Sequence, residues 1–159
     1  MFETAELERK VTKRDFKMQV PGLRTELLKV QQELRREKRF QVMIVLGGVD
    51  GAGKSEMANT LSDWMDPRGI ATHEFGPPTE DERERPEYWR YWKTLPPKGD
   101  IAIYIGAWYS RSLLDNAYER TGLATYDRDL SRIVAFEREL VNDGILILRF
   151  WMQLGKKAQ

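Results

Sequence analysis

The residues with the clearest chemical meaning form a glycine-rich segment, Gly48-Val49-Asp50-Gly51-Ala52-Gly53-Lys54-Ser55. It fits the pattern G-x-x-x-x-G-K-[ST] at every fixed position. Glycines let the chain curl until several backbone N–H groups point at one anion, and a following helix adds free N–H groups and its positive dipole end. In this pattern the lysine binds the outer phosphates and the hydroxyl holds Mg²⁺. We therefore predict a phosphate-binding site made by Gly48, Gly51, Gly53, Lys54 and Ser55.

Asp50 lies inside this segment and has two interpretations. A carboxylate beside bound phosphates is repelled unless a cation lies between them. In a functional role, Asp50 is therefore a Mg²⁺ ligand or a base for the attacking oxygen. In a structural role, it is a turn residue that hydrogen-bonds its own backbone. The loop alone does not separate the two roles.

The spacing of apolar residues predicts alternating strands and helices around the loop. Strands are expected at 40–46, 70–75, 101–105 and 145–148, and helices at 54–66, 86–95, 110–119 and 125–142. A strand thus precedes the glycine-rich segment and a helix follows it, which is the context that a phosphate-binding loop requires. Strands that alternate with helices predict an α/β domain with a parallel sheet covered on both faces.

The start of the chain has a different character. Residues 1–22 are charged and end in Pro21-Gly22, so we interpret them as a charged lead-in to a domain that spans 23–159. A narrow apolar stripe from Leu23 to Leu34 predicts a helix. This stripe either packs on the domain or forms an interface with a partner helix.

Composition excludes several classes of protein. The 26 Lys and Arg residues face 25 Asp and Glu, and a net charge of +1 argues against a nucleic-acid-binding protein. The absence of cysteine and the single histidine, His73, exclude a disulfide scaffold and a histidine-rich or thiolate metal site. No apolar run reaches the roughly 20 residues of a membrane helix, and the first residues lack a secretory signal pattern. We expect no membrane association and a cytoplasmic location.

Several segments beyond the loop resemble one family, the family-2 polyphosphate kinases. That family's loop also carries an Asp at the position of Asp50. The stretch 77–99, with its Pro77-Pro78-Thr79-Glu80 start and its Leu95-Pro96-Pro97-Lys98-Gly99 end, is similar to the family's segment between the second and third strands. Trp108-Tyr109 resembles the S-W-Y motif, and 136–151 resembles the F-E-R-x-L…D-G…K-F-W run. The resemblance covers residues 40–159.

The resemblance implies both a fold and a reaction. The fold is a three-layer P-loop NTPase/kinase-like α/β fold. The reaction is Mg²⁺-dependent phosphoryl transfer between inorganic polyphosphate and a nucleotide such as AMP, ADP or GDP. Asp50, Lys54 and Arg111 would be catalytic, and Asp50 and Ser55 would bind the metal. Arg111 matches a basic position after the family's S-W-Y motif; the alternative is that it lies on a solvated helix face.

Two departures from the family pattern weaken the prediction of catalysis. The family's third strand ends in a Walker B-like Asp followed by Arg, whereas this chain has Ile105 and Gly106. The change removes a metal ligand and a cation, and phosphoryl transfer depends mainly on orientation and charge. The chain also stops where family members continue into a lid. We therefore expect a fragment truncated before the lid, or one half of a tandem-domain polyphosphate:AMP phosphotransferase.

Other cations and aromatic residues have two interpretations each. Arg83, Arg85, Arg90 and Lys93 either line a polyphosphate path or form a solvated face with their acidic neighbours. Trp89, Trp92 and Trp108 either stack on a nucleotide base or pack within the domain. His73 is expected to fill the core or a sheet edge.

Three functions therefore compete. The first is an active polyphosphate-dependent nucleotide kinase. The second is a degenerate domain that binds phosphates or a partner domain and supports a catalytic half elsewhere. The third is an unrelated P-loop kinase or NTPase acting on a small molecule, which the missing Walker B Asp and the later family segments disfavour. Oligomer formation and a second polyphosphate kinase-like domain are both compatible with the sequence.

Overall fold

A four-stranded parallel sheet forms the centre of the molecule. The computed structural model describes residues 11–153. The strands are β1 (Val42–Gly48), β2 (Ile70–Glu74), β3 (Ile101–Ile105) and β4 (Leu146–Met152). They pair in the order β2-β3-β1-β4, and every pair is parallel. The predicted α/β architecture is confirmed, because each short apolar run became a strand and each intervening segment returns the chain to the same end of the sheet.

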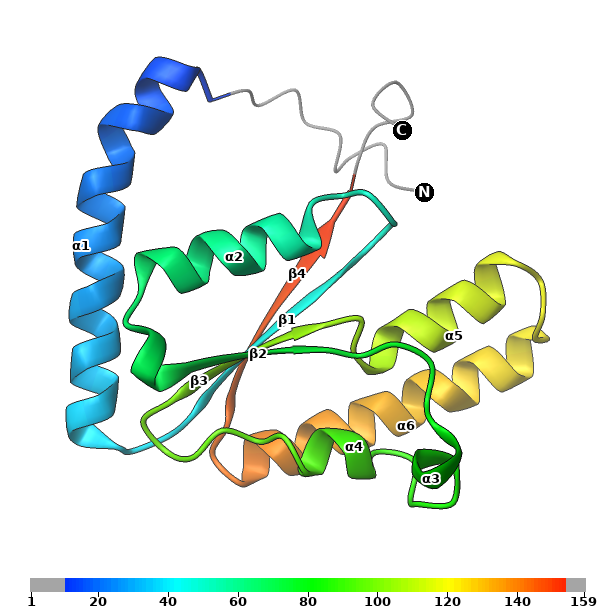
Figure 1. Ribbon diagram of the computed structural model, residues 1–159. Coiled ribbons are helices and arrows are strands. Elements are labelled where there is room, and N and C mark those ends of the chain that lie inside the picture. The colour runs from blue at the N-terminus through cyan, green and yellow to red at the C-terminus, as the bar shows by residue number, and fades with distance from the viewer. Residues whose placement is uncertain (1–10, 154–159) are drawn as a thin grey trace.

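Helices cover both faces of this sheet, as Figure 1 shows. α1 (Lys13–Glu37) and α2 (Lys54–Trp64) lie on one side, and α5 (Trp108–Ala117) and α6 (Leu123–Asn142) lie on the other. Alternate strand residues point to opposite faces. Ile44 and Ile103 therefore pack in the core cluster that includes Leu34 of α1. Met43 and Tyr104 pack in the cluster that includes Phe136 of α6.

The segment between β2 and β3 differs most from the prediction. It holds two single-turn helices, α3 (Glu80–Arg83) and α4 (Trp89–Trp92). The 3₁₀ turn η1 (Pro67–Gly69) lies before this segment and leads into β2. Thr79 Oγ1 accepts from the Glu82 N–H at 3.3 Å, and Glu82 Oε2 accepts from the Thr79 N–H at 2.9 Å. This capping box starts a helix in the interval between the strand predicted at 70–75 and the helix predicted at 86–95, where no element is expected.

The predicted lead-in is wrong for residues 13–22, because α1 begins at Lys13 and runs through Pro21. Thr12 caps the helix by accepting from the Asp15 N–H at 3.1 Å, and Phe16 packs beside Trp64 with ring centroids 6.4 Å apart. The helix therefore continues through a proline, although an internal proline costs about 3 kcal/mol. Residues 1–10 lie outside the described part of the chain. Neither α1 nor any other helix in the described part is both long and apolar enough to cross a membrane.

Gln31 ties α1 to the turn before β2. Its side chain is 1% exposed. The Gln31 Nε2 donates to the Asp66 carbonyl at 2.8 Å, and the Asp66 N–H donates to Gln31 Oε1 at 2.7 Å. A buried amide that makes both of its hydrogen bonds fixes the helix to the sheet at one register.

Gln31→Ala should lower the free energy of unfolding by about 2 kcal/mol, because it leaves the Asp66 N–H without its partner, removes one of two donors to the Asp66 carbonyl and empties a buried site. Gln32→Ala, one residue along on the exposed side, is the matched control and should change it by less than about 0.5 kcal/mol. Urea unfolding of both variants measures the difference. Equal losses in the two variants would contradict this role of Gln31.

Candidate phosphate-binding site

The glycine-rich segment forms a tight loop at the carboxyl edge of the sheet. It connects the end of β1 to the start of α2 (Figure 1). Gly48, Gly51 and Gly53 have φ angles of 134°, 75° and 85°. The Ala52 N–H donates to the Val49 carbonyl at 3.3 Å inside the loop. The strand, loop and helix thus follow one another as predicted, and the phosphate-binding role of the loop stays a prediction.

Gly48 is fixed by the strand beside it. It pairs with Met152 at the end of β4. A Cβ atom on Gly48 would overlap the Met152 carbonyl oxygen. The positive φ of Gly48 is a second reason for glycine, since residues with a Cβ rarely adopt it. The last pair of the β1–β4 ladder therefore sets where the loop begins.

Lys54 folds back over the loop. Its Nζ donates to the Gly48 carbonyl at 2.8 Å and to the Val49 carbonyl at 2.9 Å, and its side chain is 16% exposed. Gly53, the N-cap residue of α2, contributes no side-chain hydrogen bond to the first turn. The first N–H groups of α2 are therefore open to an anion, and a phosphate would offer Lys54 a charged acceptor in place of two neutral carbonyls.

The two predicted metal ligands, Asp50 and Ser55, are both exposed at the loop. The turn interpretation requires a hydrogen bond from the neighbouring backbone to the Asp50 side chain, and the described residues show none. The Asp50 carboxylate lies 3.7 Å from Lys54 Nζ instead. Mg²⁺ is commonly held by one or two protein oxygens together with phosphate oxygens and water. One carboxylate and one hydroxyl fit that requirement. No cluster of three or more Asp, Glu, His or Cys residues suited to a metal exists in the described part of the chain.

The carboxyl end of β3 brings no ligand to this edge. Ile105 is 5% exposed and packs in the core cluster beside α2. Gly106 has a φ of 64°, and a Cβ there would lie 2.7 Å from the Phe75 carbonyl oxygen. The two departures from the family pattern therefore differ physically. A side chain could be exchanged at position 105, whereas at position 106 the backbone itself requires glycine.

Arg111, the third predicted catalytic residue, lies in the first turn of α5. Its side chain is 82% exposed, and its Nε lies 3.7 Å from Asp115 Oδ2 on the same helix. A role in catalysis would require the guanidinium to leave Asp115. The catalytic role of Arg111 stays a prediction, and the solvated-face alternative describes its position in this structure.

The tryptophans divide between core and surface. Trp108 is 4% exposed and packs edge to face against Tyr91 and Phe136, with centroid distances of 5.2 and 5.1 Å. Such a buried ring cannot stack on a nucleotide base, so the packing interpretation holds for Trp108. Trp89 lies beneath Arg85 and Lys93, which are 5.4 and 5.2 Å from its ring.

Arg90 is not part of a solvated face. Its side chain is 14% exposed, and its Nη2 lies 3.4 Å from Glu82 Oε2. Its Nη1 donates to the Gly76 carbonyl at 3.0 Å, and its guanidinium lies 5.1 Å from the Phe75 ring. Arg90 thus holds the segment between β2 and β3 in place, and this structural use separates it from the exposed Arg83 and Arg85.

A polar cluster that lies on the α5–α6 side of the sheet was not predicted from the sequence. It joins Trp108 and Tyr109 of α5, Glu137 of α6 and Arg149 of β4. The signal was present in the sequence, because these residues belong to the W-Y, F-E-R-x-L and R-F-W segments. Only the fold brings the three segments together.

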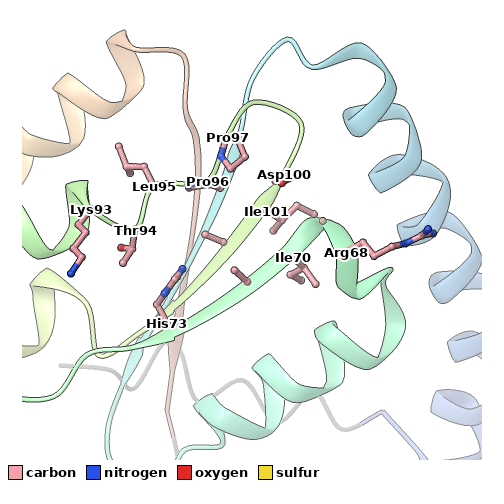
Figure 2. Close-up of a pocket in the computed structure, with 13 residues that line it drawn as sticks. Arg68, Ile70, His73, Lys93, Thr94, Leu95, Pro96, Pro97, Asp100 and Ile101 are labelled. Atoms are coloured by element: carbon pink, nitrogen blue, oxygen red, sulfur yellow. The ribbon is translucent and has the colours of Figure 1, made fainter.

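A cavity of about 340 Å³ lies away from the phosphate loop, at the amino ends of β2 and β3 (Figure 2). His73 reaches it from β2 and packs edge to face on Tyr104 at 5.4 Å, which agrees with its predicted filling role. Burial lowers the pKa of His73. Arg68 points away from His73 in Figure 2 and pairs with Asp66 at 2.6 Å. Around this cavity Arg68 pairs with Asp66, Asp100 lies 3.9 Å from Arg35, and Lys93 lies over the Trp89 ring. The described residues that line the cavity lack the free helix N–H groups that the loop offers to a phosphate.

Both the sequence and the fold of this chain are similar to those of known proteins. The family model described as polyphosphate kinase 2 (PPK2) matches residues 10–159. A polyphosphate:AMP phosphotransferase of Pseudomonas aeruginosa is 41% identical over 157 residues, which are 99% of this chain and 32% of the relative. An NDP-polyphosphate phosphotransferase of Ruegeria pomeroyi is 29% identical over 94% of this chain and 49% of its own length. This chain thus spans about a third to a half of these curated relatives.

The fold comparison agrees with the sequence comparison. A crystal structure of a Pseudomonas aeruginosa protein assigned to polyphosphate kinase 2 superposes with a TM-score of 0.92 at 41% identity, over 99% of this chain and 34% of the other. The residues that the family model matches include the glycine-rich loop and the segments around Trp108, Glu137 and Arg149. Because the family model covers nearly the whole chain, this chain belongs to the polyphosphate kinase 2 family.

Proposed function

We propose that this chain binds inorganic polyphosphate at the phosphate loop and takes part in phosphoryl transfer between polyphosphate and a nucleoside mono- or diphosphate. The observation that carries the proposal is the loop itself. Lys54 is held over it, and the N-terminus of α2 is open to an anion. The names of the relatives, polyphosphate:AMP and NDP-polyphosphate phosphotransferase, support AMP, ADP and GDP as candidate acceptors.

Each residue of the loop has a separate task in this proposal. The loop N–H groups and Lys54 bind the phosphates and neutralise charge that shifts between them. Asp50 and Ser55 would hold Mg²⁺, which supplies positive charge to the phosphate oxygens when it is bound. Arg111 would add a cation from α5. A cytoplasmic location, where nucleotides are abundant, is part of the same proposal.

A second candidate function is phosphate binding without transfer, in support of a catalytic domain elsewhere. Ile105 and Gly106 favour it, because β3 ends without a carboxylate and without a cation. The Pseudomonas aeruginosa relative is about three times as long as the matched region, which leaves room in that protein for a further domain. We therefore propose a second polyphosphate kinase-like domain, or another copy of this chain, as the partner in this case.

Lys54→Ala should weaken binding of tripolyphosphate by about 100-fold, because it removes a charge-assisted contact worth about 2 to 3 kcal/mol. Isothermal titration calorimetry measures the affinity. The same variant should not form ADP or ATP from polyphosphate, Mg²⁺ and AMP or ADP. Lys29→Ala, which removes an exposed lysine of α1, is the control and should bind like the wild type. Equal binding by Lys54→Ala and wild type would refute the phosphate loop as the site.

Ile105→Asp separates the two candidate functions. If the chain binds without transfer because β3 lacks a carboxylate, Ile105→Asp should raise the transfer rate by about tenfold or more in the presence of Mg²⁺. Ile105→Asn has nearly the same shape without the charge, and it should show no gain. Transfer by the wild type at a rate that Ile105→Asp does not improve would contradict the second candidate.

A further inference from the structure

One carboxylate on α6 collects three donors from two other elements. The Glu137 side chain is 12% exposed. Its Oε1 accepts from Trp108 Nε1 at 3.1 Å and from the Tyr109 hydroxyl at 2.7 Å. Its Oε2 accepts from Arg149 Nη1 at 3.0 Å. Hydrogen bonds to an ionised group are the strong ones in proteins, and their loss leaves half-buried polar groups unpaired.

Two of these donors are the first two residues of α5. Two residues separate the start of that helix from the end of β3 at the carboxyl edge of the sheet. Its N-cap residue, Ala107, contributes no side-chain hydrogen bond. The Trp108 and Tyr109 side chains, rather than a cap, attach the start of this helix to Glu137 of α6.

The third donor, Arg149, connects Glu137 to β4. Arg149 Nη1 also donates to the Tyr109 hydroxyl at 2.9 Å. Arg149 lies three residues before Met152, which pairs with Gly48 at the start of the phosphate loop. Figure 1 shows β4 ending beside the connection from β1 to α2. Glu137 thus links α5, which follows β3 at the carboxyl edge, to β4, whose end pairs with Gly48 at the loop.

The cluster is suited to holding a fixed geometry. Burial and the hydrogen bond to Glu137 raise the pKa of Tyr109, so the phenol keeps its proton and acts as a donor. Hydrogen bonding to Tyr109 and the charge of Glu137 raise the pKa of Arg149. The raised pKa values keep the Tyr109 phenol protonated and the Arg149 guanidinium charged, so both remain donors.

We propose that Glu137 is a positioning residue for the phosphate loop, holding the start of α5 and the end of β4 in the arrangement that phosphate binding requires. This inference rests on the proposed function, because it takes the loop as the site of polyphosphate binding. Glu137 touches no phosphate in this account. It acts through Tyr109 and Arg149, and through the strand that confines Gly48.

The test compares Glu137→Gln with Glu139→Gln on the same helix, where Glu139 is exposed. A glutamine at 137 keeps one oxygen for Trp108 and Tyr109 but turns an NH₂ group towards Arg149. Tripolyphosphate affinity is measured by calorimetry well below the melting temperature of each variant. Glu137→Gln should bind about tenfold more weakly than wild type, and Glu139→Gln should bind equally well. A folded Glu137→Gln variant with wild-type affinity would overturn the inference, since a merely structural role would lower stability alone.

Tyr109→Phe is the milder variant if Glu137→Gln does not fold. It removes only the hydroxyl and should weaken binding by about threefold. Hydrogen exchange of residues 47–53 without ligand gives a second readout. Exchange should be faster in Glu137→Gln or Tyr109→Phe than in Glu139→Gln, and equal exchange would overturn the inference. Wild type that binds no tripolyphosphate would instead refute the proposed function, while the exchange comparison still decides the role of Glu137.

Discussion

The phosphate loop begins where β1 and β4 make their last backbone pair, Gly48 with Met152. No side chain fits between the two, because a Cβ on Gly48 would overlap the Met152 carbonyl oxygen. β1 therefore has to turn at this point, and the turn places Lys54 over the loop and the first N–H groups of α2 towards the carboxyl edge. The site depends on a strand that is far from the loop in sequence and adjacent to it in the sheet.

The strands β1 and β3 bring different kinds of residue to the carboxyl edge of the sheet. β1 leads into the whole glycine-rich loop that is proposed to bind phosphate. β3 delivers Ile105, which belongs to the core, and Gly106, whose conformation requires glycine. The structure is therefore better equipped to bind phosphate than to orient a metal ion. The hydrogen bonds of Glu137 join α5, α6 and β4.

The sequence predicted the parts that depend on local pattern. Short apolar runs indicated all four strands, and the spacing from Gly48 to Ser55 indicated the loop. Pro21-Gly22 was misleading, because α1 continues through both residues and contacts parts of the chain far along the sequence, such as Trp64 beside Phe16. The roles of Glu137 and Arg90 were also hidden. Both depend on which segments the fold brings together, and no single segment carries that information.

The most direct test of the account is an amide NMR titration of the chain with tripolyphosphate. The account predicts that chemical shift changes cluster at residues 48–56, with the largest at Gly51, Gly53 and Lys54, and that Lys54→Ala needs about 100-fold more tripolyphosphate to produce them. Shift changes centred on the cavity around His73 and Lys93, or the same changes at 48–56 in Lys54→Ala, would contradict it.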